Sequence, residues 1–308
     1  MPRRPMKAWL RKRLQQNAPP MKIATYNDGS RDGQLVVVSR DLTTAHYAAG
    51  VASRLQQVLD DWNFLSPQLE ELSQTLNHGK ARHAFAFDPR MCLAPLPRVF
   101  HFASAVLGQQ SPDDGPMMRV RRSDQLLGAC EPVPRIDAFR NDDDHPIRLQ
   151  LAAQLGAITG DLSSGGAADD SLAAVRLLTA SVMWYPMSDQ PVRDDAIVAS
   201  FAPVAITPDE LGLRWHDGLL DQFRLEILIN GQRMQFDEVE HPDTRPIGSC
   251  LAECAALRGL RAGSIVATTI HGGANICFAS GDSVRVAFSA PDGDSVFGVI
   301  STTFETRP

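Results

Sequence analysis

One stretch of the sequence brings acidic side chains and a histidine close enough together to hold a metal ion. Asp237, Glu238 and Glu240 directly precede His241. Carboxylate oxygens suit Mg²⁺ or Ca²⁺, and an imidazole can complete such a site. Pro242 follows at once, which favours an exposed loop, so a solvated acidic loop is the alternative interpretation.

Two other groups could ligate metals. Residues 142–144 are three consecutive aspartates before His145, but neighbouring loop side chains point in different directions, which favours a solvated linker. Cys250 and Cys254 lie one helical turn apart without a second Cys or His pair, which indicates two thiols on a helix face rather than zinc ligands. The five cysteines are scattered and odd in number, which is typical of a reducing, cytoplasmic compartment.

Several catalytic motifs are missing from the sequence. It contains no Gly-x-Ser-x-Gly elbow, no phosphate-binding glycine loop and no His-Glu-x-x-His. The eight histidines are isolated from one another. A catalytic triad is still possible, because its members need not be adjacent in sequence.

Charge and hydropathy narrow the class of protein. Net charge is −6, and the first 20 residues carry basic but no acidic side chains, so the remainder is more acidic still. Such a body is a poor nucleic-acid surface, which needs clustered Lys and Arg. No run of 18 apolar residues predicts a membrane span. We interpret residues 1–20 as a disordered basic tail, with a targeting helix as the alternative.

The N-terminal elements are predicted from turns and spacing. Strands at 23–26 and 35–39 flank a turn-rich stretch and indicate a hairpin. A helix is expected next, capped by Asp41 or Thr43. Its apolar positions recur at helical spacing: Tyr47, Val51, Leu55, Val58, Leu59 and Trp62. A second helix is expected to start at Ser66-Pro67, where proline suits the first turn.

The second half of the sequence is predicted to be rich in strands. Asn230-Gly231 is a strong hairpin signal between strands at 223–229 and 232–236. A helix is expected at 247–257, and the apolar run 173–183 is compatible with a helix. Further strands are expected at 264–268, 284–288 and 296–301. The fold class is therefore α+β, with a boundary near 136–146 between a small α/β domain (21–135) and a larger β-rich domain (136–308).

Several stretches together resemble the fumarylacetoacetate hydrolase family, especially its bacterial members. The matches occur in order along the chain, at 21–26, 29–42, 52–67, 87–90, 94–98, 157–161, 203–211, 261–266, 281–286 and 295–300. The resemblance implies a fumarylacetoacetase-like C-terminal domain, a dimer and a role in aromatic catabolism. It also implies a hydrolase acting on C–C bonds of β-dicarbonyl acids. In active members Mg²⁺ or Ca²⁺ sits among an upstream Asp, a Glu-x-Glu pair and a later Asp, and a His–Glu pair activates water.

Aligned on Ile158-Thr-Gly-Asp161, this chain lacks those ligands. The Glu-x-Glu pair falls on Ala152 and Gln154, and the later Asp falls on Met183. Other family positions also differ. The upstream Asp falls near Gly115, beside Asp114, and the Lys that usually lies near the metal falls on Ala196. The Gly-Thr segment that contacts substrate falls near 269–270, and His101 lies close to, but not in, the position of the catalytic His. Methyl and thioether groups cannot hold a hard divalent cation, and an amide offers only a neutral oxygen.

Three hypotheses remain. The first is a protein without metal and without the hydrolase activity, kept as a binding protein or subunit partner in a homodimer or with an active relative. The second is an enzyme of altered chemistry that uses residues of the 237–241 stretch. The third is a different register with a working Mg²⁺ or Ca²⁺ site that includes Asp114, in an active hydrolase on substrates such as fumarylacetoacetate or acylpyruvates.

Overall fold

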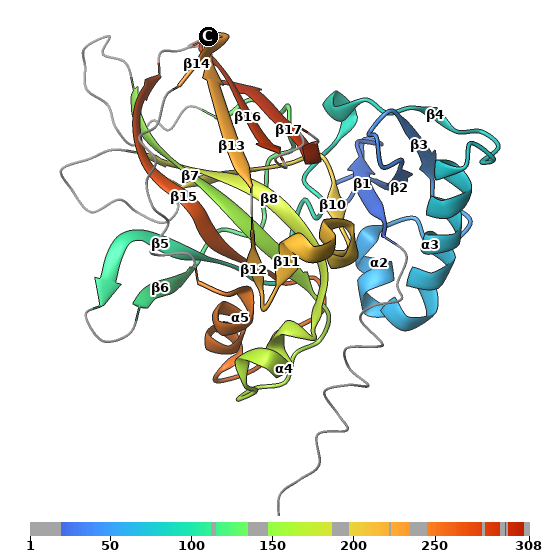
Figure 1. Ribbon diagram of the computed structural model, residues 1–308, viewed down its shortest axis with the longest axis horizontal. Coiled ribbons are helices and arrows are strands. Elements are labelled where there is room, and N and C mark those ends of the chain that lie inside the picture. Colours follow the sequence, from blue (N-terminus) through green and yellow to red (C-terminus); the bar gives the residue numbers. More distant parts are fainter. Residues whose placement is uncertain are drawn as a thin grey trace, which may run out of the picture.

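The computed structural model describes residues 20–111, 115–134, 147–186, 197–221, 223–234, 245–278, 281–289, 293 and 295–304. A small N-terminal unit of strands and helices lies beside a larger, strand-rich body (Figure 1). The predicted α+β class, with a small α/β part and a β-rich part, is confirmed. In the part of the chain described, no helix has both the length and the apolar character to span a membrane.

The predicted N-terminal hairpin is confirmed. β1 (Lys22–Tyr26) and β2 (Gln34–Val38) pair antiparallel, with Lys22 opposite Val38. Both strands are buried almost throughout, because neighbouring elements cover both faces. β3 (Thr44–Tyr47) and β4 (Phe85–Ala86) extend this sheet beyond β2.

The prediction of a long helix after Asp41 is wrong for its first half, because residues 44–47 form a strand and the first helix begins at Leu55. Asp41 caps no helix: its Oδ1 accepts hydrogen bonds from the Thr43 backbone N at 3.1 Å and the Thr43 Oγ1 at 2.8 Å. These bonds close a tight turn between β2 and β3, so Tyr47 lies on a strand. The spacing of Tyr47 and Val51 fits a helix, but pairing with β2 outweighs that local pattern.

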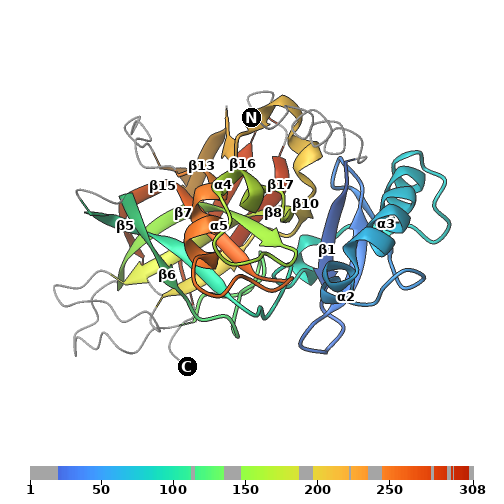
Figure 2. The ribbon, with the colours of Figure 1, turned by 90° about the horizontal axis from the view of Figure 1, so that it is seen from below.

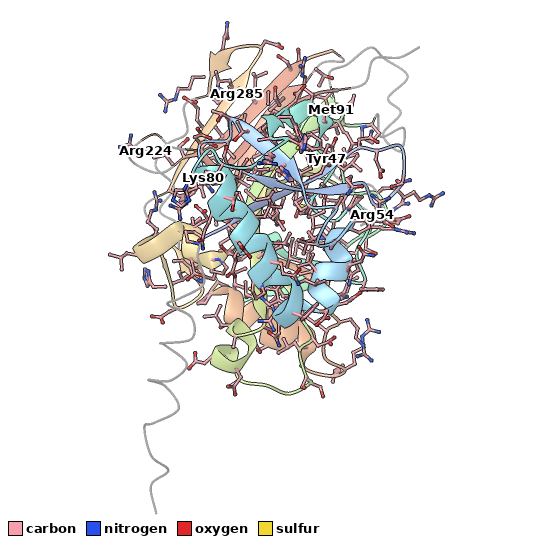
Figure 3. All side chains as sticks on the ribbon, turned by 90° about the vertical axis from the view of Figure 1, so that its right-hand side faces the viewer. Tyr47, Arg54, Lys80, Met91, Arg224 and Arg285 are labelled. Atoms are coloured by element: carbon pink, nitrogen blue, oxygen red, sulfur yellow. The ribbon has the colours of Figure 1, made fainter. Side chains whose placement is uncertain are left out.

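Two helices follow and pack across the N-terminal sheet. They are α2 (Leu55–Asp60) and α3 (Trp62–Asn77). The predicted start at Ser66-Pro67 is wrong, because α3 begins at Trp62 and contains Pro67. Figure 3 looks onto this unit, with α3 in front of its strands. A single 3₁₀ turn, η1 (Pro89–Met91), precedes the passage into the body.

The body is built on long strands that continue the N-terminal sheet. The 11-stranded sheet runs β4-β3-β2-β1-β10-β8-β7-β15-β5-β6, and β9 also pairs with β8. Its body strands are β5 (Phe102–Ser111), β6 (Gly115–Val120), β7 (Ile147–Thr159), β8 (Val175–Pro186), β9 (Val198–Phe201), β10 (Ala205–Ile206) and β15 (Ile265–Phe278). β5 and β6 precede residue 136 in sequence, yet they join the sheet through β15.

The helix-compatible interpretation of 173–183 is wrong, because these residues lie mainly in β8. β8 pairs with β7 on one side and with β9 and β10 on the other. Its residues 177–185 are buried on both faces, so the apolar residues do not alternate with polar ones. An unbroken apolar run of this kind is equally compatible with a buried strand or a buried helix, and only the neighbouring strands decide.

A second sheet covers one end of the body. Its order is β14-β13-β16-β17, formed by β13 (Arg224–Ile229), β14 (Gln232–Arg233), β16 (Ser283–Ser289) and β17 (Ser295–Thr303). The predicted Asn230-Gly231 hairpin is confirmed: Ile229 pairs with Gln232, and both turn residues have positive φ, 49° and 77°. The short hairpin β11 (Trp215–His216) and β12 (Leu219–Leu220) stands apart.

Helices cover one face of the long strands. The predicted helix at 247–257 is confirmed as α5 (Ile247–Ala255), which lies beside α4 (Ala168–Leu172) in Figure 2. Ile247 and Leu251 of α5 share a buried cluster with Leu155 and Val266. The opposite face of these strands belongs to a second cluster, which also contains the buried apolar residues of α2 and α3. Residues 151–159 of β7, 177–185 of β8 and 265–268 of β15 are therefore buried on both faces.

The N-terminal unit is joined to the body by pairing and by buried polar contacts. β1 pairs with β10, with Lys22 opposite Ile206. The Lys22 ammonium, 4% exposed, donates to the Val296 backbone oxygen at 2.8 Å. The Arg176 guanidinium lies 6.0 Å from the Trp62 ring, which connects β8 to the start of α3. These contacts hold the unit against the same strands that carry the candidate site.

An acidic pair at this junction predicts a pH effect. Burial raises the pKa of Glu70 on α3 and of Asp209 on η4 (Pro208–Arg214), and the Asp209 charge raises the Glu70 pKa further. A carboxyl whose folded pKa is raised favours folding below its unfolded pKa, and that contribution is lost as pH rises through the folded value. Asp209→Asn should therefore stabilise the protein by roughly 0.5 kcal/mol at pH 7, after allowing for solvent screening.

Thermal melts at pH 4 and pH 7 test this effect. The stabilisation by Asp209→Asn should be smaller at pH 4 than at pH 7, because the raised pKa of the native carboxyl makes it take up protons as the pH falls. The matched control is Glu71→Gln, at an exposed position next to Glu70 on α3, which should leave the melting temperature unchanged. An equal gain at both pH values would contradict the prediction.

Candidate functional site

The three positions at which the resemblance expects metal carboxylates lie together. Ala152 on β7 and Met183 on β8 are direct cross-strand partners, and Gln154 follows two residues along β7 on the same face. On the other side of β7, the backbone of Gly272 on β15 is paired with Ala152. We call the surface formed by Ala152, Gln154, Met183 and Tyr185 the Ala152 face.

The Ala152 face does not have the chemistry that a divalent cation needs. Ala152 and Gln154 are completely buried and Met183 is 1% exposed. Direct cross-strand partners place their Cβ atoms about 5 Å apart, so ligands at 152 and 183 would converge on one ion. The methyl group of Ala152 has no lone pair, and the Met183 thioether is a soft ligand. Within the described ranges, no group of three His, Cys, Asp or Glu side chains is placed to hold a metal.

Gln154 is the polar member of the Ala152 face. Its Nε2 donates to Thr269 Oγ1 on β15 at 3.3 Å. Its Oε1 is buried, and among the described residues it has no hydrogen-bond partner. Ser181, directly opposite on β8, is also fully buried, and its Oγ likewise has no partner in the described part of the chain. A buried, unsatisfied polar atom costs about 1–3 kcal/mol.

The substitutions Gln154→Leu and Gln154→Glu should therefore have different effects on the free energy of unfolding. Gln154→Leu removes the unsatisfied oxygen while nearly keeping the volume, so the free energy of unfolding should rise or change by less than about 1 kcal/mol. Gln154→Glu introduces a buried carboxyl, and we expect it to lower the free energy of unfolding by about 2 kcal/mol or more at pH 7. Urea denaturation of both variants gives the comparison. A Gln154→Glu variant as stable as the native chain would contradict the description of this position as closed.

A buried arginine completes the surroundings of the Ala152 face. Arg121 follows β6, is 6% exposed, and donates through Nε to Ser104 Oγ on β5 at 2.9 Å. Its guanidinium lies 5.7 Å from the centre of the Tyr185 ring on β8. Sequence reasoning missed this residue, because Arg119, Arg121 and Arg122 together resemble a solvated basic surface. Only the packing of the strands distinguishes the buried member.

Among the described residues, the charged group that acts on His101 is the cation Arg258 rather than a carboxylate. His101 directly precedes β5, and its backbone oxygen accepts from Ile265 N at 2.8 Å. Burial lowers the pKa of His101, and the neighbouring cation Arg258 lowers it further. The ring is therefore neutral at pH 7, and its charged neighbour is a cation, which cannot orient the ring as a carboxylate would.

The other sequence candidates lie elsewhere. Asp114 and the stretch with Asp237, Glu238, Glu240 and His241 lie outside the described residues, as do the 142–145 acidic group and residues 1–19. Cys250 and Cys254 lie on α5, and burial raises their pKa values to about 11 and about 12. Both thiols are therefore protonated at pH 7, as in buried structural cysteines.

Comparison with known proteins identifies the fold. The family model for the fumarylacetoacetase N-terminal domain 2 matches residues 21–98. No curated protein sequence matches the chain. The maleylpyruvate hydrolase from Sphingobium sp. SYK-6, solved in complex with manganese(II) ion and pyruvate, is similar in structure, with a TM-score of 0.65 and 14% identity over 93% of this chain and 100% of that one.

Two other enzymes have similar structures. The fumarylacetoacetate hydrolase from Exiguobacterium antarcticum has a TM-score of 0.64 and 14% identity, over 93% of this chain and 100% of that chain. The 2-hydroxyhepta-2,4-diene-1,7-dioate isomerase from Mycobacterium marinum has a TM-score of 0.58 and 14% identity, over 92% and 98%. Residues 21–98 thus match the model of the fumarylacetoacetase N-terminal domain, and the chain shares the fold of the fumarylacetoacetate hydrolase and the maleylpyruvate hydrolase named above.

Proposed function

We propose that this chain has the fumarylacetoacetate hydrolase fold without its metal-dependent C–C bond chemistry, and that it acts as a binding protein or subunit partner. The single observation that carries the proposal is the convergence of Ala152, Gln154 and Met183 on one buried surface. At these three positions the resemblance expects carboxylates. Here they supply a methyl group, an amide and a thioether.

The energetics favour joint loss of the ligands. Carboxylates that converge without a cation repel one another and are costly to bury. Replacing all three by uncharged side chains removes that cost and allows the strands to pack as ordinary core. A metal ion contributes several kcal/mol of transition-state stabilisation in such enzymes. The side chains of the Ala152 face offer no equivalent Lewis acid.

The proposal includes a partner. The resemblance implies a dimer, so we propose a homodimer or a heteromer with a catalytically active relative. In the heteromer, turnover belongs to the active relative. In the homodimer, the chain acts as a binding protein. Size-exclusion chromatography with light scattering distinguishes a monomer, a homodimer and a heteromer with an added relative.

Calorimetric titration with Mg²⁺, Ca²⁺ and Mn²⁺ tests the proposal. Mn²⁺ is included because the maleylpyruvate hydrolase was solved with this ion. We expect no saturable site with a Kd below about 1 mM, which corresponds to about −4 kcal/mol of binding free energy. Micromolar binding at a stoichiometry of one would contradict the proposal.

A turnover assay gives the second test. Fumarylacetoacetate and acylpyruvates should not be consumed faster in the presence of the native chain than in its absence. Turnover abolished by a chelator would instead support the alternative, an active hydrolase on β-dicarbonyl acids with a rearranged site. Turnover unaffected by a chelator would support an enzyme of altered chemistry.

A further inference from the structure

Two thiols lie on one face of α5, and this face runs from the core to the surface. Cys250 and Cys254 are four residues apart in the helix, so their side chains lie one above the other. Side chains at this spacing have their Cβ atoms about 5–6 Å apart. Cys250 is completely buried, whereas Cys254 is partly exposed. The outer thiol can therefore be reached from solvent, and the inner thiol is enclosed by protein.

A buried hydroxyl faces the inner thiol. Thr268 on β15 is 1% exposed, and among the residues that the structure covers its Oγ1 has no hydrogen-bond partner. Burial raises the pKa of Cys250, while the Arg245 guanidinium and the Thr268 hydroxyl oppose that rise, so the hydroxyl lies beside the sulfur. A thiol is a weak acceptor, but a thiolate accepts strongly. A deprotonated Cys250 would therefore satisfy this buried hydroxyl.

A third sulfur atom lies beside the same helix. Met118 on β6 packs against the buried cluster that contains Cys250, as Cys254 does. The Met118 backbone N donates to Glu253 Oε1 at 3.2 Å, which places β6 next to the residue before Cys254. Thiolate and thioether sulfurs are soft ligands, and soft ligands select Cu(I) rather than Mg²⁺ or Ca²⁺.

We propose that Cys250, Cys254 and Met118 form a binding site for a soft monovalent cation, Cu(I). Each thiol releases its proton to solvent as its sulfur binds the ion, and copper stays in the +1 state, so no electron is transferred. A structural zinc ion would need four ligands. Cu(I) is satisfied by two or three sulfur atoms, which is what α5 and β6 offer.

This site is separate from the Ala152 face. Successive residues of a strand point to opposite sides, so Thr268 faces α5 while Thr269 bonds Gln154 on the other side of β15. The Cu(I) site goes beyond the proposed function, which concerns hard divalent cations at the Ala152 face. Titrations with Cu(I) and with Mg²⁺, Ca²⁺ or Mn²⁺ therefore test the two separately, and either can fail without the other.

Competition for Cu(I) tests the site. The native chain is titrated, without oxygen and under reducing conditions, against the coloured Cu(I) complex of bicinchoninate, whose absorbance reports the copper that the protein removes. We expect one Cu(I) per chain. Cys254→Ser should bind Cu(I) at least 100-fold more weakly, and Met118→Leu at least threefold more weakly. The matched control is Cys130→Ser, which removes another partly exposed thiol and should leave the affinity unchanged.

X-ray absorption at the copper edge gives an evidence line that does not depend on how well a variant folds. The native chain loaded with one Cu(I) should show sulfur ligands alone. Nitrogen or oxygen ligands, full affinity in Cys254→Ser or Met118→Leu, or loss of binding in Cys130→Ser would overturn the inference. No removal of copper from bicinchoninate by the native chain would overturn it as well.

Discussion

Ala152→Phe should lower the free energy of unfolding by about 3 kcal/mol, because the space at this position is already filled. Ala152 is completely buried, lies directly opposite Met183 on β8 and is paired with the backbone of Gly272 on β15. Extra atoms in a close-packed interior force side chains away from their preferred rotamers and shift the backbone. Urea denaturation at pH 7 measures the loss.

The result separates a closed core from an open cleft. A cleft that still admitted a metal and a substrate would accommodate the phenyl ring at little cost. The control is Met183→Leu, a swap that nearly conserves volume and should cost less than about 1.5 kcal/mol. A loss below about 1 kcal/mol for Ala152→Phe would show that an open pocket persists, and it would weaken the proposed loss of metal chemistry.

Trp184→Ala should cost about 3–5 kcal/mol, the range for removing a large aromatic side chain from a core. Trp184 is completely buried on the opposite face of β8 from Met183. Its Nε1 donates to Ser200 Oγ on β9 at 3.0 Å, and its ring meets Phe304 edge-on at 5.4 Å. The side chain thereby fastens β8 to β9 and to the residue that follows β17.

Trp184→Phe separates the hydrogen bond from the packing. The phenylalanine keeps most of the apolar volume but leaves Ser200 Oγ without its donor, so we expect a loss of about 1–2 kcal/mol. Thermal and chemical denaturation should both show that Trp184→Ala lowers the stability more than Trp184→Phe does. If Trp184→Ala were as stable as Trp184→Phe, packing at the centre of β8 would not be the stabilising factor that the structure indicates.

The Ala152 face links the predictions at positions 152 and 154. In the part of the chain described, the surface formed by Ala152, Gln154 and Met183 is packed with uncharged side chains. A buried guanidinium lies beside it. Metal binding, overpacking at 152 and the stability of Gln154 variants therefore examine the same property from three directions: whether this surface can accept a cation.

The sequence by itself determined the turns and the helix that depend on residues close together in the chain. The hairpin turn at Asn230-Gly231 needs positive φ at both residues, which asparagine and glycine adopt readily. The turn-rich stretch between β1 and β2 and the helical spacing of α5 are signals of the same kind. The order of the motifs that resemble the fumarylacetoacetate hydrolase family predicted the fold, while the assignment of positions 152, 154 and 183 to the family's metal ligands stays a prediction.

Only the tertiary structure decided the remaining features. Residues 175–186 form a strand because β7, β9 and β10 pair with them. A strand buried on both faces shows no alternation of apolar and polar residues, so its sequence does not distinguish it from a buried helix. Thr44 to Tyr47 joined the sheet for a similar reason. The burial of Arg121 beside Ser104 and Tyr185 was not readable from the sequence, because burial is a property of the residues that surround a side chain in space.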